Sequence, residues 1–354
     1  MTDALRPLLA LTPDELTERV VELGGRPFHA KVARAALLSG VRSYEEMTSL
    51  PAALREALGA EVPLLSSELR HTTRATDGAT KLLLGFPSRE AGSDEVETVH
   101  IPPHNPKSPK GATLCVSTQV GCPVACPFCA SGLAGLVRNL KAHEVLEQFV
   151  RGMEVGPIGR AVVMGIGEPL LNYKSVRAAL DVVNAELGIG ARKVTLSTVG
   201  YPLKVREVAE TQPPFQLAIS LHTPFDDERE LLVPAMKGVP IEEVLAAGDA
   251  WFSATHREVT YEYVILGGHN DTPGHAAELG RRLKGRRATV NLIPWNPLTR
   301  APDDGPMPSY RRPLAEVVTG FQEDLQLSGV VTTVRWSRGL ESDAACGQLR
   351  LHNA

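Results

Sequence analysis

The sequence predicts an α/β protein in which a small N-terminal helical domain precedes a partial (β/α)6 barrel. Beyond about residue 140, short apolar runs alternate with longer amphipathic segments, which is typical of parallel strands joined by right-handed crossover helices. Glycine-rich and polar motifs follow the expected strands, at the end where barrels carry their functional residues. Helix-capping signals before residue 85 favour the helical domain.

The composition is that of a globular protein with one large domain and an appendage. Of 354 residues, 43% are hydrophobic, and the formal net charge is −4. This charge argues mildly against a general nucleic-acid binder, although it is compatible with a local basic face. The densest positive cluster indicates a solvated helix end or an RNA contact about equally; it comprises Arg281, Arg282, Lys284, Arg286 and Arg287.

The sequence also predicts where the protein resides. It has no apolar run of membrane-spanning length, and nothing in it resembles a signal peptide. Its five cysteines are sparse, which favours reduced thiols over disulfides. We therefore expect a cytoplasmic protein without a membrane partner.

Residues 1–85 are expected to form the helical accessory domain. The segment 12–15 (Thr-Pro-Asp-Glu) combines an N-cap, a proline at the first helical position and acids in the first turn. A second helix is expected over 29–38, and two more helices are expected to begin at residues 43 and 51. None of these segments carries a catalytic pattern.

The barrel core is expected over 86–336, and a C-terminal tail over 337–354. Apolar runs predict strands at 82–86, 96–101, 113–117, 161–164, 193–197, 215–221, 258–266, 288–293 and 330–336. Amphipathic segments predict helices at 143–153, 175–187, 241–252, 274–283 and 314–325. Proline, lysine and glycine over 102–111 predict a loop.

Three cysteines with the spacing C-x3-C-x2-C form the most specific motif: Cys122, Cys126 and Cys129. Thiolates this close together suit a soft metal centre. Three cysteines cannot fill the four corners of a cubane cluster, so one iron would be open to substrate, as in an open catalytic zinc site. A structural zinc site with His143 as fourth ligand is the alternative, whereas a disulfide is disfavoured.

The cysteine motif resembles that of the radical S-adenosylmethionine (SAM) enzymes. The segments 115–122, 138–140 and 343–349 narrow the resemblance to the RlmN/Cfr family, and the likeness extends from about residue 95 to 349. It implies a barrel of the radical SAM type and a [4Fe-4S] cluster held by Cys122, Cys126 and Cys129. SAM would bind at the open iron.

The same resemblance assigns a SAM site to the strand ends. The segment 165–169 (Gly-Ile-Gly-Glu-Pro) is not a dinucleotide fingerprint, because Leu170 stands where the third glycine should be. Read singly, residues at strand ends are more often turn or cap residues. By resemblance, the SAM-contacting residues are Gly167, Glu168, Ser197, Ser220, Leu221, His222 and Asn296.

The two remaining cysteines, Cys115 and Cys346, would each be a small buried hydrophobe if considered alone. Adenine C2 is a poor nucleophile, however, whereas a thiolate can accept a methyl group from SAM. The resemblance implies that Cys346 carries this methyl as S-methylcysteine and that Cys115 resolves the RNA adduct, forming a disulfide. It also assigns Glu97 as the acceptor of the adenine C2 proton, although a lone strand glutamate usually faces solvent.

Resemblance to the RlmN branch implies methylation of C2 at adenosine 2503 of 23S rRNA and at adenosine 37 of tRNAs. Two SAM molecules would be used per turnover, with electrons from a donor such as flavodoxin or ferredoxin. Two alternatives stay open: Cfr-type methylation at adenine C8, and a non-catalytic iron–sulfur RNA-binding protein. The accessory domain resembles one that holds RNA, but His29 and Ala36 depart from the family's usual Arg and Trp.

Overall fold

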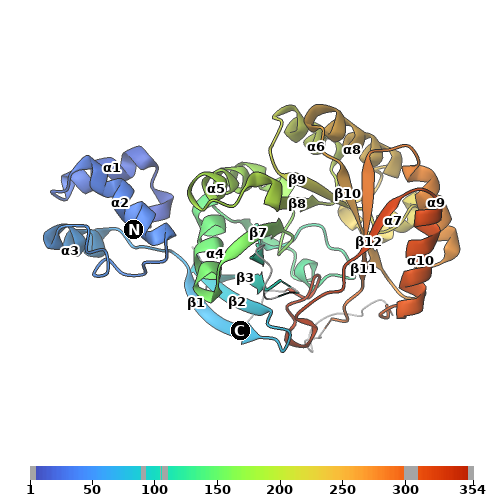
Figure 1. Cartoon of the computed structure of the whole chain (residues 1–354), viewed down its shortest axis with the longest axis horizontal. Coiled ribbons are helices and arrows are strands. Elements are labelled where there is room, and N and C mark those ends of the chain that lie inside the picture. Colours follow the sequence, from blue (N-terminus) through green and yellow to red (C-terminus); the bar gives the residue numbers. More distant parts are fainter. Residues whose placement is uncertain (1–4, 89–92, 104, 106–110, 299–309, 350–354) are drawn as a thin grey trace.

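A mixed sheet organises the protein, as the computed structural model shows for residues 5–88, 93–103, 105, 111–298 and 310–349 (Figure 1). Its ten strands lie in the order β1-β2-β3-β4-β7-β8-β9-β10-β11-β12. β1 to β4 pair antiparallel, whereas β4 and β7 to β12 pair parallel. The strands are β1 (Glu68–Arg74), β2 (Thr80–Pro87), β3 (Ser93–Ile101), β4 (Ala112–Cys115), β7 (Ile158–Val163), β8 (Val194–Thr198), β9 (Gln216–Ser220), β10 (Val259–Ile265), β11 (Ala288–Pro294) and β12 (Val331–Val334).

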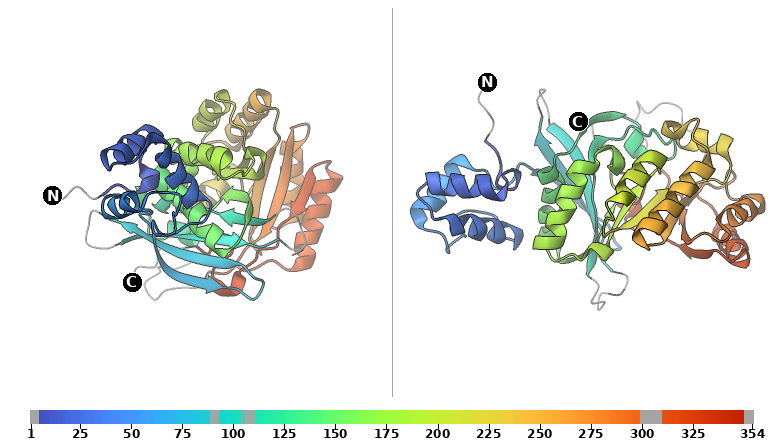
Figure 2. Two further views of the ribbon diagram at one scale, coloured as in Figure 1. Left: turned by 60° about the vertical axis from the view of Figure 1, so that its left-hand side comes forward. Right: turned by 90° about the horizontal axis from the view of Figure 1, so that it is seen from above.

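Helices connect the parallel strands and cover the outer face of the sheet (Figure 1, Figure 2). They are α4 (Ala142–Val155), α5 (Tyr173–Glu186), α6 (Pro202–Glu210), α7 (Asp226–Leu232), α8 (Ile241–Thr255), α9 (Pro273–Leu283) and α10 (Ala315–Leu327). Six successive strand–helix units run from β4 to α10, and β12 adds a seventh parallel strand. The predicted partial (β/α)6 barrel is confirmed.

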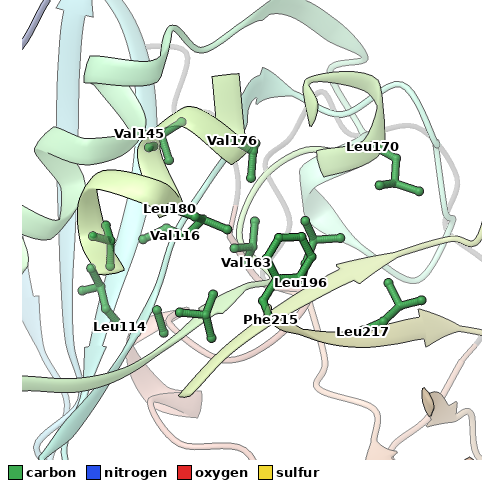
Figure 3. Close-up of a cluster of buried hydrophobic side chains, with 14 of the residues drawn as sticks. Leu114, Val116, Val145, Val163, Leu170, Val176, Leu180, Leu196, Phe215 and Leu217 are labelled. Atoms are coloured by element: carbon green, nitrogen blue, oxygen red, sulfur yellow. The ribbon is translucent and has the colours of Figure 1, made fainter. Parts of the chain in front are cut away.

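The two faces of this sheet have different roles because side chains alternate along a strand. Leu114 of β4 and Leu196 of β8 face the helices and pack near Val145 and Leu180 (Figure 3). Cys115, next to Leu114, faces the other way and lies in a smaller apolar cluster inside the barrel. The alternation that builds the core therefore turns Cys115 inward.

The N-terminal helices form a unit set apart from the barrel (Figure 2). It comprises a 3₁₀ turn (Leu8–Ala10), α1 (Pro13–Glu22), α2 (Pro27–Leu38) and α3 (Ala52–Glu61). Thr12 and Glu15 form the capping box that begins α1, because each side chain accepts a hydrogen bond from the other's backbone N–H.

Two elements before β2 differ from the sequence prediction. Residues 68–74, expected within the helical domain, form β1, whereas the strand predicted at 82–86 is found as part of β2. β1 is an almost fully exposed edge strand of polar residues, so it has no apolar run to reveal it. The helix expected to begin at residue 43 is only a turn, since Pro51 leaves too few residues for a stable helix.

Three further points complete the comparison. α6 and α7 were not predicted from the sequence. Most of the loop expected over 102–111 lies outside the described residues. None of the described helices is both long and apolar enough to cross a membrane.

Candidate active site

A cavity of about 1000 Å³, counting the space at its mouth, lies at the carboxyl ends of the parallel strands. Most of the residues singled out in the sequence line it: Cys122, Cys126, Cys129, Gly167, Glu168, Ser197, Ser220, His222, Asn296 and Cys346. Leu221, Cys115 and Glu97 do not line this cavity. Residues far apart in the sequence therefore meet here, as expected where parallel strands end.

The cysteine loop, residues 122–135, is closed at its base by a two-stranded antiparallel ribbon of β5 (Gln119–Gly121) and β6 (Leu136–Asn139). Gly121 has φ +76°, and a Cβ there would lie 1.9 Å from the Gly135 carbonyl oxygen. Only glycine fits this close approach. Ala125, between two of the cysteines, also has a left-handed φ of 58°, a costly conformation that marks a constrained loop.

The three thiols fit an iron–sulfur cluster by position and chemistry. All three are free, half-buried and lining the same cavity. No group of three side chains in the described chain is close enough to hold a single metal ion. A cubane cluster spans several ångströms, so its cysteines stand farther apart than the ligands of one ion. Cys122, Cys126 and Cys129 would therefore hold such a cluster, and Cys126 lies within electrostatic range of the other two.

The thiols are protonated in the absence of a metal. Burial raises the pKa of Cys122 to about 12 and raises the pKa of both Cys126 and Cys129. Thiolates bound to iron would remove this penalty, because a metal ligand must be deprotonated. Binding of an iron–sulfur cluster to the three thiolates would therefore stabilise this site.

The loop after β7 approaches the base of the cysteine loop closely. Gly167 has φ +109°, and a Cβ there would lie 2.7 Å from Gln119 Cβ. The Glu168 carboxylate accepts the backbone N–H groups of Leu170 and Val199, each at 2.9 Å. Burial raises the pKa of Glu168 to about 7. Glu168 thus ties two strand ends together while lining the cavity.

His222 and Leu221 follow β9 and have different positions. His222 lines the cavity, its Nδ1 accepts the Val264 N–H at 3.1 Å, and its ring meets Phe128 edge-on at 4.9 Å. Burial lowers the pKa of His222 to about 3, so the ring is neutral. The Leu221 side chain is buried, while its backbone N–H donates to the Glu262 carbonyl. Any contact of Leu221 with a ligand would involve its backbone.

The C-terminal segment, residues 337–349, is fastened over the cavity. Asn296 Nδ2 donates to the Cys346 carbonyl oxygen at 2.9 Å. The cysteine loop holds the next residues: the Ala130 N–H donates to Gly347, and the Ser131 hydroxyl donates to Leu349 at 2.7 Å. These bonds place Cys346 on the wall that also carries the cysteine motif.

Cys115 is buried at the end of β4, beside the cavity. It shares a buried cluster with Ala344 and Leu349, which flank Cys346 in the sequence, and both cysteines are free thiols. Burial raises the pKa of Cys115 to about 12 and that of Cys346 to about 11, while the Arg335 guanidinium opposes both shifts. The structure thus brings together two thiols that are 231 residues apart in the sequence.

Glu97 is buried on β3, so the solvent-facing alternative is wrong. Its carboxylate pairs with Lys81 Nζ at 2.8 Å, and Lys81 also donates to the Asp343 carbonyl at 3.0 Å. Glu97 lines a separate recess with Lys81, His71, Thr73 and Leu83. It is therefore linked to the C-terminal segment through one ammonium group, outside the main cavity.

Comparisons with known proteins agree with this geometry. The Radical SAM superfamily model matches residues 116–279. A probable dual-specificity RNA methyltransferase RlmN of Thermosynechococcus vestitus is 43% identical over 313 residues, or 88% of each chain. Its counterpart in Trichormus variabilis is 41% identical over 97% of this chain and 93% of its own. A solved radical SAM methyltransferase from Sphaerobacter thermophilus superposes with TM-score 0.86 and 37% identity over 98% of this chain and 99% of its own. The chain belongs to the RlmN family.

Sequence reasoning missed several residues that build the site in this RlmN family member. Trp295 Nε1 donates to the Phe128 carbonyl at 2.9 Å and so holds the cysteine loop against β11. Glu262 lines the cavity and accepts from Asn291 at 2.8 Å. An acid inside the apolar run of β10 was a usable signal for Glu262. His143, the alternative zinc ligand, lies in the first turn of α4 and does not line the cavity.

Proposed function

We propose that this RlmN family member methylates C2 of adenosine 2503 in 23S rRNA and of adenosine 37 in tRNAs. One observation carries the proposal: Cys346 lines the cavity of the three cluster cysteines and lies beside Cys115. Methylation of an unreactive ring carbon through a protein thiol needs this combination. The RlmN relatives are named as probable RNA methyltransferases, which supports RNA as the substrate.

In this proposal Cys346 accepts the methyl group of one SAM and presents it as S-methylcysteine. The strand-end residues hold SAM, with Gly167 permitting close backbone approach and Ser197, Ser220, His222 and Asn296 contributing from the cavity wall. Cys122, Cys126 and Cys129 would hold a [4Fe-4S] cluster, which would supply the electron for reductive cleavage of the second SAM. A flavodoxin or ferredoxin would deliver that electron in the cytosol.

Two side chains complete the reaction in this scheme. The S-methyl carbon of Cys346 loses a hydrogen atom to the 5′-deoxyadenosyl radical and bonds to adenine C2. Glu97 accepts the C2 proton once the C-terminal segment moves with the RNA, and the cluster would take back one electron. Cys115 then attacks the Cys346 sulfur, the bond from that sulfur to the bridging carbon breaks, the carbon takes up a proton to become the methyl group, and the disulfide that forms is reduced by an external thiol. The arrangement would also serve methylation at C8, so mapping the product by mass spectrometry identifies the carbon.

The Cys346→Ala variant tests the methyl carrier. We expect loss of RNA methylation, with reductive cleavage of SAM to 5′-deoxyadenosine kept within about twofold, because the cluster cysteines are unchanged. Both products are measured on anaerobically reconstituted enzyme with dithionite. Full methylation by the variant would refute the thiol carrier. A colourless protein that cleaves no SAM would instead support a non-catalytic metal protein.

The Cys115→Ala variant tests the resolving thiol. Without Cys115, the carbon bridge between Cys346 and adenine should persist, so a covalent protein–RNA species is expected on a denaturing gel. The double variant Cys115→Ala/Cys346→Ala is the control and should give no such band. If the single variant releases only free RNA while folded and cluster-loaded, Cys115 is not the resolving residue.

A further inference from the structure

A second cavity opens near the amino-terminal ends of β4, β7 and β8, away from the strand ends that carry the cysteine motif. It measures about 930 Å³ with the space at its mouth. Its floor includes Thr113, which is paired with Arg160 of β7, and Val162, which is paired with Thr195 of β8. The C-terminal segment forms the opposite wall. In the described part of the chain, this cavity is therefore separate from the cavity of the cysteine motif.

Four cations line the second cavity. Arg160, Lys193, Arg335 and Arg338 all contribute to its wall, and among the residues that the structure describes no Asp or Glu does. None of the four forms an ion pair with a described residue; Arg338 donates to the Pro102 carbonyl, and Arg335 contacts the sulfur of Met164. Uncompensated cations converging on one cavity create a positive field that attracts an anionic ligand.

This arrangement contrasts with the positive cluster at 281–287. There, Arg281 pairs with Glu278, and Arg282 pairs with Glu278 and Asp226. Arg286 pairs with Glu242 and Asp249. The densest basic run of the sequence is thus largely neutralised within the fold. The four cations of the second cavity, in contrast, form no ion pair with a described residue.

An aromatic ring accompanies these cations. Trp336 lines the second cavity, and 46% of its surface is exposed. An exposed tryptophan between Arg335 and Arg338 provides a face on which a nucleobase can stack. Cations for phosphates beside an aromatic platform for bases are the combination that binds single-stranded nucleic acid.

Cys346 connects the two cavities. Of the described residues, it alone lines both. We propose that the second cavity binds the nucleotides flanking the target adenosine, so that RNA reaches Cys346 from the opening opposite the SAM side. Arg160 and Lys193 contact phosphates, and Trp336 stacks on an unpaired base. This assignment rests on the proposed RNA methylation and adds where the substrate enters.

The variant Arg160→Ala/Lys193→Ala tests the phosphate contacts. Both side chains are exposed and unpaired, so the fold should tolerate their loss. Binding of a fluorescent RNA hairpin carrying the adenosine 2503 loop is measured by anisotropy over a range of salt concentrations. The slope of log affinity against log salt should become shallower by about 1.4, because each single-strand phosphate contact contributes about 0.7. Affinity near 0.1 M salt should fall on the order of 10-fold.

The matched control is Arg206→Ala/Lys237→Ala, which removes two exposed cations outside the cavity and should bind RNA like wild type. Trp336→Ala should weaken binding on the order of 10-fold while leaving the salt slope unchanged, because stacking releases no counterions. Methylation of Cys346 by SAM alone should persist in every variant.

The outcomes separate this inference from the proposed function. If the cavity variant keeps the wild-type affinity and slope, the cavity does not bind RNA and the inference is overturned. The same holds if it binds RNA normally but loses electron transfer from an acidic flavodoxin, since a protein then docks there. If wild-type enzyme acquires S-methylcysteine yet neither binds nor methylates RNA, the proposed function itself fails.

Discussion

Lys81 shows how a single side chain connects two parts of the site. It is buried on β2 with Glu97 on the neighbouring β3, and the same ammonium group donates to the C-terminal segment at Asp343. A buried carboxylate needs a charge partner, because desolvation penalises the ionised form. The pair therefore holds the Glu97 carboxylate in a fixed place. The hydrogen bond from Lys81 to Asp343 also connects this pair to the segment that carries Cys346.

Removing Lys81 alone should lower the free energy of unfolding by more than removing both charges of the pair. We expect Lys81→Met to lower the free energy of unfolding by about 3 kcal/mol or more, since it leaves a buried carboxylate without its cation. The double variant Lys81→Met/Glu97→Gln should recover a large part of that loss. Urea denaturation of the two singles and the double measures the coupling. Strictly additive losses would show that the two side chains are not energetically linked.

At the scale of elements, the β5–β6 ribbon closes the cysteine loop. Two glycines, one on each side of the ribbon, differ in the space that an added Cβ would find. Gly121 has φ +76° and a carbonyl oxygen where its Cβ would be, whereas Gly135 has φ +68° and open space there. Any L-residue is strained at both positions, but only at Gly121 would it also push the two strands apart.

Alanine at these two glycines should therefore have unequal effects. Gly135→Ala should cost about 1–2 kcal/mol, the usual strain of a left-handed conformation. Gly121→Ala should cost clearly more and should also lower the iron content after reconstitution, because the clash displaces the base of the cysteine loop. Thermal unfolding and iron assays on both variants make the comparison. Equal losses would mean that the close approach at Gly121 is not needed to shape the loop.

The elements also show what sequence could and could not predict. The spacing of Cys122, Cys126 and Cys129 and the polar residues after strands are local signals, and local periodicity places most of the sheet. β1 escaped prediction because its residues are polar and exposed. The contact of Lys81 with Asp343 joins residues 262 positions apart, and no local pattern encodes such a contact. The position of the C-terminal segment could therefore be found only from the three-dimensional structure.

At the scale of the whole molecule, the helical unit is attached to the barrel by apolar packing and by ion pairs, and its Leu8 belongs to the same buried apolar cluster as Phe149 of α4. Arg34 binds the Glu186 carboxylate through two nitrogens at 2.7 and 3.0 Å. Arg42 pairs with Glu154 at 2.7 Å and donates to the Val150 carbonyl at 2.9 Å. Both carboxylates lie on barrel helices, α5 and α4. These ion pairs therefore add to the apolar contacts of the junction.

The variant Arg34→Ala/Arg42→Ala should loosen the helical unit without damaging the barrel. Each pair contributes up to about 1 kcal/mol, so losing both should raise the open population up to about 30-fold. Limited proteolysis between α3 and β1 should accelerate accordingly, while methylation of Cys346 by SAM stays at the wild-type rate. Arg19→Ala is the matched control, because Arg19 pairs with Glu22 and Glu61 inside the helical unit. If cleavage is equally slow in all three proteins, these ion pairs do not hold the unit to the barrel, and its attachment must rest on the apolar contacts of the junction.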